Sequence, residues 1–332
     1  MCFSFQSIYY TTSGRKLPDT RYSYVLPAII LPMYEYRRER AKKSFPLLPF
    51  LAAMTILALI AMLIVSQRAN STVVSPLPND APSTFSFPNL FARKKDPEEL
   101  RKKIQTLVGN TWKNYSVYIK DYASGFTLGM NETVIFSAAS VNKIPIIAAL
   151  YWQVQNQAVD LDTTVTIQAS DVQYYGTGTI QSDPPGSTYS VKTLARLMMQ
   201  QSDNTAAYIL ANYTVGLDTI QTLVSRWGLT QTDIANNKTS NRDMEILMEK
   251  IYTGKITNTA YTQEMLAFFK DSDFEDRLPA LLPKGVTVYH KIGNGQGAIH
   301  DVGIVQSANI TYYIGILTSD IVNEEESVKL EA

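Results

Sequence analysis

The segment from Phe136 to Leu150, FSAASVNKIPIIAAL, is the feature that most constrains the fold. Small residues lead into Ser140, and an apolar run follows Lys143, which predicts an apolar helix. Residues three apart on a helix lie on one face, so Lys143 is expected beside Ser140. Pro145 leaves the carbonyl of Val141 without its helical partner. We therefore expect the helix to begin at Ser140, with the hydroxyl at its amino end.

A serine beside a lysine can be a nucleophile and its base. The serine hydroxyl is a weak nucleophile until a base takes its proton, and a lysine can be that base only if burial or another cation lowers its pKa. The spacing alone is weak, because Ser-x-x-Lys is expected about once by chance in a chain of this length. Ser13 and Lys16 have the same spacing. The pair at Ser140 therefore needs partners elsewhere in the chain.

The reactive side chains present limit the chemistry. Lys+Arg and Asp+Glu both total 30, so the net charge gives no reason to expect nucleic-acid binding. Cys2 is the single cysteine, which excludes an internal disulfide framework, and the two histidines, His290 and His300, are too few for a typical Cys/His zinc site. Neither histidine lies in a recognisable triad motif. A Ser/Lys mechanism without a cofactor or metal fits this inventory.

The amino-terminal part of the chain predicts a membrane anchor. Residues 1–45 carry eight Lys/Arg against three Asp/Glu, and residues 46–67 carry no charge. About twenty helical residues cross a bilayer core, and the basic side is expected in the cytoplasm. We expect an uncleaved single-pass anchor rather than a signal peptide, because the apolar run exceeds the usual length and no small-x-small site follows. Met33 is an alternative start to Met1.

The rest of the chain is predicted to hold a linker and one folded domain. Residues 68–95 are rich in Pro, Ser and Thr and predict an extended linker. The folded domain is expected over 96–332, outside the cell, and its first helix should be capped by Asp96 with Pro97 in the first turn. The alternating segments 116–122 and 126–130 predict a hairpin. Helical patterns cover 191–270, and strands are expected at 286–292, 298–305 and 311–318. Early strands and late strands around a helical middle predict an α+β fold with a mixed antiparallel sheet, in which the first and last strands are neighbours.

Two further clusters could serve the serine. Ser202-Asp203-Asn204 lies in a break between two helical patterns, where such residues commonly cap a helix. The functional interpretation is that Ser202 relays a proton while Asn204 hydrogen-bonds the lysine and the substrate amide.

The second cluster is Lys291-Ile292-Gly293-Asn294-Gly295, whose Asn-Gly pair is a strong hairpin signal. The functional interpretation puts Lys291 on an edge strand facing the nucleophile. Gly293 would then let the substrate backbone lie close.

Ser-x-x-Lys, Ser-Asp-Asn and Lys-x-Gly, in this order over about residues 100–320, resemble the penicillin-recognising serine acyl-enzyme superfamily. This superfamily contains the class A β-lactamases and the penicillin-binding proteins. The resemblance implies a β-lactamase/transpeptidase-like fold, in which helices flank a five-stranded antiparallel sheet and a second lobe is all helical.

The resemblance also implies roles for individual residues. Ser140 would be the acylated nucleophile and Lys143 its general base. Ser202 would pass the proton to the leaving nitrogen, Asn204 would orient the lysine, and Lys291 would hold the substrate carboxylate.

Substrate binding is expected from Gly293 and Asn294. By the same resemblance, the backbone N–H groups of Ser140 and Asn294 would form the oxyanion hole, where one donor is often worth about 3–4 kcal/mol.

Two departures from the family pattern bear on function. The loop whose glutamate activates water in class A enzymes is largely missing, and no glutamate lies between Trp227 and Glu245. Asp233 is an acidic residue that could substitute for this glutamate. Ile292 stands where the family usually has a threonine, which removes a hydrogen-bond donor to the substrate. The last helix also looks short.

Three functions therefore remain open. The first is a membrane-anchored extracellular serine hydrolase that resembles class A β-lactamases and hydrolyses a β-lactam or related amide. The second is a penicillin-binding D,D-peptidase or transpeptidase that acts on cell-wall peptides and deacylates slowly. The third is a non-catalytic module that binds the cell wall.

Overall fold

The computed structural model describes residues 96–308 and 310–332. The predicted tail, anchor and linker lie outside these residues. In the part described, no helix has both the length and the apolar character needed to cross a membrane.

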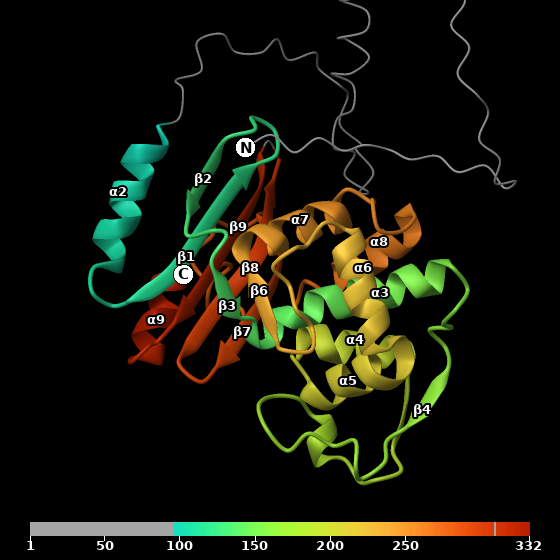
Figure 1. Ribbon diagram of the computed structural model, residues 1–332. Helices are drawn as coiled ribbons and strands as arrows, with labels where there is room; N and C mark the ends of the chain where they lie inside the picture. Colours follow the sequence, from blue (N-terminus) through green and yellow to red (C-terminus); the bar gives the residue numbers. More distant parts are fainter. Residues whose placement is uncertain (1–95, 309) are drawn as a thin grey trace, which may run out of the picture. The chain divides into compact units, whose positions relative to one another are not determined.

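Helices and strands follow one another in the order early strands, helices, late strands (Figure 1). The α-helices are α2 (Pro97–Val108), α3 (Lys143–Gln155), α4 (Val191–Gln200), α5 (Asn204–Ile209), α6 (Leu217–Arg226), α7 (Asn241–Tyr252), α8 (Thr259–Ala267) and α9 (Glu324–Glu331). Two 3-10 helices, η1 (Ala139–Asn142) and η2 (Ile180–Ser182), and a π-helix, η3 (Leu210–Val215), lie between them. The strands are β1 (Asn114–Asp121), β2 (Thr127–Met130), β3 (Ile135–Ser137), β4 (Thr164–Thr166), β5 (Thr188–Ser190), β6 (Lys238–Ser240), β7 (Thr287–Gly295), β8 (Ala298–Ser307) and β9 (Ile310–Ser319).

A five-stranded antiparallel sheet in the order β2-β1-β9-β8-β7 forms the centre of the domain. The predicted hairpin is β1–β2, and the three predicted late strands are β7, β8 and β9. The first and last strands are neighbours, as expected, with Val117 opposite Ile316. This order leaves β7 at one edge of the sheet.

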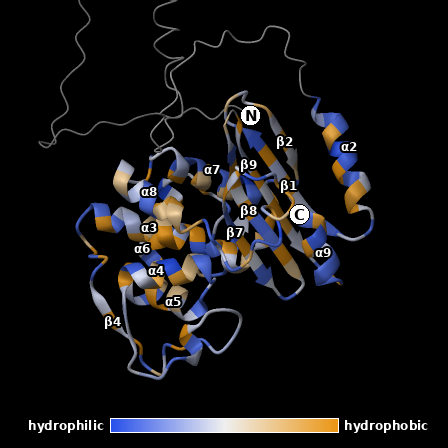
Figure 2. Cartoon of the chain, turned by 180° about the vertical axis from the view of Figure 1, so that it is seen from behind, coloured by the Kyte–Doolittle hydropathy of each residue, from blue (hydrophilic) through white to orange (hydrophobic). Residues whose placement is uncertain are grey.

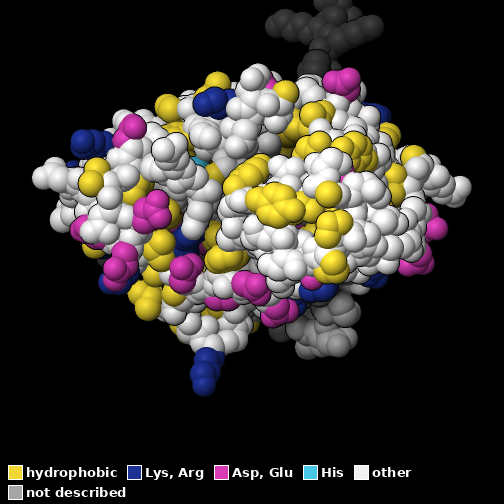
Figure 3. Space-filling model, turned by 90° about the horizontal axis from the view of Figure 1, so that it is seen from below, with side chains coloured by type: hydrophobic (Ala, Val, Ile, Leu, Met, Phe, Trp, Pro, Cys, Tyr) yellow, Lys and Arg dark blue, Asp and Glu magenta, His cyan; other side chains and the backbone are white. Residues whose placement is uncertain are grey.

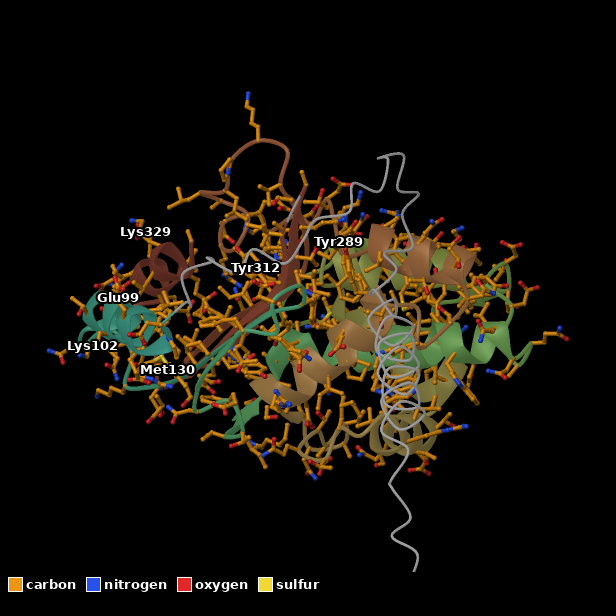
Figure 4. All side chains as sticks on the ribbon, turned by 90° about the horizontal axis from the view of Figure 1, so that it is seen from above. Glu99, Lys102, Met130, Tyr289, Tyr312 and Lys329 are labelled. Carbon is orange, nitrogen blue, oxygen red and sulfur yellow. The ribbon has the colours of Figure 1, made fainter. Side chains whose placement is uncertain are left out.

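Helices cover both faces of this sheet. On one face, α2 and α9 pack through an apolar cluster that includes Val108, Trp112, Ile316 and Val328. Figure 4 shows Glu99 and Lys102 of α2 and Lys329 of α9 on the outer side of this layer. The stripes of α2 in Figure 2 agree, because an amphipathic helix turns its apolar side to the core. The other face carries α3 and α7 in the larger core cluster.

The second lobe consists of α4, α5, η3 and α6, which pack against α3 (Figure 1). The helical region predicted over 191–270 is therefore correct except for one strand. Residues Lys238–Ser240 form β6, which pairs with β3 through Phe136 opposite Thr239. The short strand carries the chain back to the segment that precedes Ser140.

Local sequence signals predicted the start of α2 correctly and the position of one turn wrongly. Asp96 Oδ1 accepts a hydrogen bond from the N–H of Glu98 at 2.9 Å, as a helix cap does, and Pro97 begins the helix. The turn between β7 and β8 is not at Asn294-Gly295. Gly295 pairs with Ala298, so the turn residues are Gln296 and Gly297, and Gly297 has the positive φ of 68° that the turn requires.

A buried asparagine at the start of α7 ties this helix to two strands. The side chain of Asn241 donates to the carbonyl of Gly315 at 2.7 Å and to Ser116 Oγ at 3.1 Å. Its Oδ1 accepts from the hydroxyl of Tyr313 at 2.7 Å. A Cβ at Gly315 would stand 2.1 Å from this Oδ1, so glycine is needed for the close approach.

Asn241→Ala should lower the free energy of unfolding by about 2–4 kcal/mol, because it leaves the Gly315 carbonyl and the Tyr313 hydroxyl buried without this partner. Urea unfolding of residues 96–332 measures the change. Asn156→Ala is the matched control, since Asn156 is exposed and bonds only to its own helix, at the carbonyl of Trp152. A loss below about 1 kcal/mol for Asn241→Ala would contradict the interpretation.

Candidate active site

Ser140 lies on η1, between the end of β3 and the start of α3. The expected helix start is thus correct to within a turn, since the α-helical hydrogen bonding begins at Lys143. Ala139 before it has a positive φ of 46°, which is strained for a residue with a side chain. His300 Nε2 lies 2.8 Å from the carbonyl oxygen of Ser137 and holds this segment against β8. Strain beside a fixed serine is typical of functional sites.

Lys143 reaches back to Ser140 and forward to the α4–α5 break. Its Nζ lies 3.0 Å from Ser140 Oγ, 2.8 Å from Asn204 Oδ1 and 2.5 Å from the carbonyl oxygen of Ser202. The last two oxygens can only accept hydrogen bonds. They match the two N–H groups of a neutral amine, which leaves the nitrogen lone pair for the hydroxyl proton of Ser140.

The electrostatics of the site favour this neutral form. Burial, and then the neighbouring Lys291 ammonium, hold the pKa of Lys143 well below its ordinary 10.5, against a smaller opposite effect of Asp203. Burial also lowers the pKa of Lys291 to about 7, with Asp301 opposing and Arg277 reinforcing the shift. The site can therefore hold one neutral and one charged lysine near neutral pH.

Ser202 stands between the two amines. Its Oγ lies 3.1 Å from Lys143 Nζ and 3.0 Å from Lys291 Nζ. Its backbone has a positive φ of 54°, so a second strained residue flanks the site. Lys291 comes from the edge strand β7, as the sequence predicted, and its Nζ also donates to the carbonyl of Ile292 at 3.1 Å. The serine hydroxyl is the bridge through which a proton could pass.

The Ser-Asp-Asn segment caps a helix, as one interpretation expected, and it also places Ser202 and Asn204 within hydrogen-bond distance of Lys143. Asp203 caps α5 by accepting from the N–H of Ala206 at 2.9 Å. Asn204 faces the cavity and donates through Nδ2 to the carbonyl of Tyr175 at 2.8 Å. Gly176, with φ of 69°, lies so close that a Cβ there would stand 2.4 Å from this Nδ2. Asn204 thus ties the loop before η2 to the lysine.

Gly293 and Asn294 follow Lys291 along the same edge strand. A Cβ at Gly293 would stand 3.1 Å from Val141 Cγ2 and 3.2 Å from the carbonyl oxygen of Ala138, so this strand and the turn of Ser140 are closely packed. The side chain of Asn294 accepts from Arg277 Nη2 at 2.7 Å. The carboxamide is therefore held by the protein, and the backbone of Asn294 is the part available to a substrate.

A cavity of about 510 Å³ lies in front of Ser140. Of the seven predicted site residues, four line this cavity: Ser140, Lys143, Asn204 and Asn294. Ser202 and Lys291 are not among the lining residues but are connected to Lys143 through the hydroxyl of Ser202. The other polar side chains of the lining are carboxamides and hydroxyls: Asn142, Asn237, Gln296, Ser137, Tyr175 and Tyr208. No aspartate or glutamate is among the lining residues, all of which lie in the described part of the chain. Asp233, the acidic substitute that the sequence offered, lines a neighbouring cavity instead.

The sequence patterns did not predict several residues around the site. Ile234, Tyr175 and Tyr208 line the cavity but belong to no motif. His290 Nδ1 lies 2.9 Å from Asp301 on the neighbouring strand. Burial by itself would lower the pKa of His290, but Asp301 and Glu275 together raise it to about 9. His290 precedes Lys291 in the sequence. A histidine next to this lysine on a predicted strand is the sequence feature that could have indicated a charged residue behind the site.

The comparisons with known proteins agree with this geometry. Residues 99–332 match the family model described as Beta-lactamase enzyme family. A β-lactamase from Bacteroides uniformis is 26% identical over 265 residues, which cover 70% of this chain and 88% of that protein.

Solved structures agree as well. PBP-A is 29% identical with a TM-score of 0.65, over 70% of this chain and 91% of that chain. A PBP-A variant solved as an acyl-enzyme complex with penicillin G is 28% identical with a TM-score of 0.64, over 70% of this chain and 94% of that chain. A β-lactamase from Sphaerobacter thermophilus, at 20% identity and a TM-score of 0.67, covers 71% of this chain and 94% of that chain and supports the fold alone.

The two lysines predict a pH profile for acylation by benzylpenicillin. Because burial and the neighbouring Lys291 hold the pKa of Lys143 well below its ordinary 10.5, the acylation rate should not keep rising as the pH approaches 10.5. The rate should fall by up to about tenfold per pH unit above about 7, where Lys291 loses the proton that pairs with the substrate carboxylate. Adduct formation followed by intact mass from pH 5 to 10 measures it.

Lys291→Arg is the diagnostic variant for this profile. A guanidinium keeps its charge, so the decline above pH 7 should disappear even if the overall rate is lower. A rate that rises steadily to pH 10 in the unsubstituted protein would contradict the assignment of a charged Lys291.

Proposed function

The chain belongs to the β-lactamase enzyme family, and from that premise we propose that it is a serine hydrolase acylated at Ser140 by a β-lactam or a related cell-wall peptide amide. One observation carries the proposal. Lys143 Nζ lies 3.0 Å from Ser140 Oγ, and the acceptors around it suit a neutral amine. This is the arrangement that turns a serine into a nucleophile.

In the proposed acylation, Lys143 takes the proton of Ser140 while Oγ bonds to the substrate carbonyl carbon. The proton then passes over Ser202, whose hydroxyl lies 3.1 Å from Lys143 Nζ, to the leaving nitrogen as the C–N bond breaks. Lys291, 3.0 Å from the same hydroxyl, keeps Ser202 oriented and attracts the substrate carboxylate. The step needs no reactant other than the protein and the substrate.

The substrate would lie along β7. The backbone N–H groups of Ser140 and Asn294 would stabilise the oxyanion, a term of about 3–4 kcal/mol per donor in related chemistry. The close packing of Gly293 against Ala138 supports this arrangement, since it brings the edge strand and the serine turn together. Asn204 would orient Lys143 and meet the substrate amide, because its Oδ1 lies 2.8 Å from Lys143 Nζ at the cavity wall.

Release of the acyl group is expected to be slow. Hydrolysis of an acyl-enzyme needs a base that activates water, and no carboxylate borders the described cavity. Ile234 lies there instead, with its N–H bonded to Gln221 at 2.9 Å and its carbonyl accepting from Asn142 at 3.4 Å. We therefore favour a penicillin-binding peptidase or transpeptidase that acts on cell-wall peptides. A β-lactamase with rapid turnover is the second candidate, favoured by the relatives that bear this name.

Incubation of residues 96–332 with benzylpenicillin should give one covalent adduct per chain, absent in Ser140→Ala, that persists for many minutes. Ile234→Glu should speed its loss by at least about tenfold, because a carboxylate would then face the acylated serine. Intact mass over time measures both. Ile234→Gln is the control for the shape of the side chain.

The outcomes separate the candidates. Rapid loss of penicillin with only a transient adduct would favour the β-lactamase, and release of D-alanine from a cell-wall peptide would favour the peptidase. If Ser140 forms no adduct with either substrate, the proposal is wrong.

We also propose that residues 46–67 anchor the protein in the cell membrane with the catalytic domain outside. The charge-free run and the eight Lys/Arg before it support this orientation. The full chain, produced in a bacterial host, should stay with the membrane after an alkaline carbonate wash, whereas residues 68–332 should not. Protease added outside the inner membrane should digest the domain. A full chain found in the soluble fraction would contradict the anchor.

A further inference from the structure

Two tyrosines beside the catalytic cavity form a fixed pair. The rings of Tyr208 and Tyr213 are 5.6 Å apart at an interplanar angle of 89°, an edge-to-face contact. Their hydroxyl oxygens are 3.2 Å apart and share a hydrogen bond. Both contacts restrict the rings before any ligand arrives.

An ordinary α-helix would not bring these residues together. Residues five apart are separated by about 140° around an α-helix, so their side chains point to different sides. Tyr208 belongs to α5, and Tyr213 to the π-helix η3, whose hydrogen bonds join residues five apart. The wider turn of the π-helix brings the two tyrosine side chains to the same side, where their rings meet edge to face. Such π-turns are rare and frequently occur at functional sites.

The pair lies at the wall of the site rather than in the core. Tyr208 lines the cavity of Ser140, and so do Leu217 and Ile234. Tyr213 is not among the lining residues but contacts Tyr208, and it is 62% exposed, while Leu217 is 37% exposed. Figure 3, the view from below, shows that hydrophobic side chains also gather at the surface around a hollow in that face. Exposed large apolar side chains next to a cavity mark binding surfaces more often than packing.

The side chains of this wall indicate which kind of group it would bind. The wall is apolar and aromatic, and no acidic side chain borders the described cavity. An uncharged, flat or apolar group would gain edge-to-face contact with the two rings and bury the exposed surface. Tyr208 raises the pKa of the Tyr213 hydroxyl, and the carboxylate of Asp171 lies near enough to Tyr213 to add to this effect, so an anionic group would be disfavoured there.

We propose that Tyr208, Tyr213 and Leu217 form a specificity subsite that binds an apolar or aromatic substituent of the molecule that acylates Ser140. This inference rests on the proposed acylation and adds the substrate class, namely amides with such a group beside the reacting carbonyl. The subsite itself needs no catalytic group.

Two penicillins that differ only in this group test the subsite. Benzylpenicillin carries a phenylacetyl group, and 6-aminopenicillanic acid has the same ring system without it. The acylation rate constant for benzylpenicillin divided by that for 6-aminopenicillanic acid measures the preference. This ratio should fall about 3–10-fold in Tyr213→Ala and in Tyr208→Ala. Tyr213 is the safer variant for folding because it is largely exposed.

Tyr312→Ala is the matched control, since Tyr312 lines a different cavity beside α2 on the sheet (Figure 4). It should leave the preference unchanged. Thermal unfolding of each variant checks that the fold is intact.

A second measurement separates the subsite from the acylation. In Ser140→Ala, which cannot form the ester, the ratio of dissociation constants for the two probes should also fall about 3–10-fold when Tyr213 is replaced. An unchanged ratio with folded protein would overturn the subsite. If no adduct forms on Ser140 in the unsubstituted protein but the binding ratio still shifts, the acylation proposal fails and the subsite stands.

Discussion

The burial of two lysines around one serine hydroxyl is the constraint on which the site depends. Lys143 and Lys291 both approach Ser202 Oγ within about 3 Å, at 3.1 and 3.0 Å. Two ammonium groups at this spacing, away from water, would repel each other, so one of them gives up its proton. The repulsion and the burial together produce a neutral amine beside Ser140 without a metal or a histidine. Removing Lys291 would raise the pKa of Lys143.

The fold holds this unfavourable arrangement with contacts from well-separated parts of the chain. Lys143 is buried in the first turn of α3, Ser202 lies in the break between α4 and α5, and Lys291 is on the sheet edge. Ala139 and Ser202 have positive φ angles that cost roughly 1–3 kcal/mol each. The apolar packing of α3 and the sheet offsets these costs, because α3 is buried on nearly all sides. Strain and buried charge are therefore concentrated where the chemistry is expected.

The sequence predicted the main helices and strands more accurately than the segments that connect them. Alternation and apolar periodicity gave the hairpin, the late strands and the start of α2, since these depend on local pattern. The strand Lys238–Ser240 was missed because three residues carry too little pattern, and only its pairing with β3 makes it a strand. The motif residues Ser140, Ser202 and Lys291 came together as expected. Ile234 and Tyr208 could not be predicted, because their position at the cavity arises from tertiary packing and from a π-turn that hydrophobic patterns do not reveal.

The wall of the described cavity beside Ser140 combines two features: no carboxylate is among the lining residues, and Tyr208 of the tyrosine pair is one of them. A short connection runs from α6 to β6, and Ile234 within it lines the cavity of Ser140. This connection brings no acid to the lining of the described cavity, to which Tyr208 and Leu217 also belong. Apolar surface that lies next to an acyl-enzyme binds the substrate but cannot activate water. A wall of this kind suits an enzyme that holds its acyl group for an incoming amine or a slow hydrolysis, and it suits rapid turnover of a β-lactam much less.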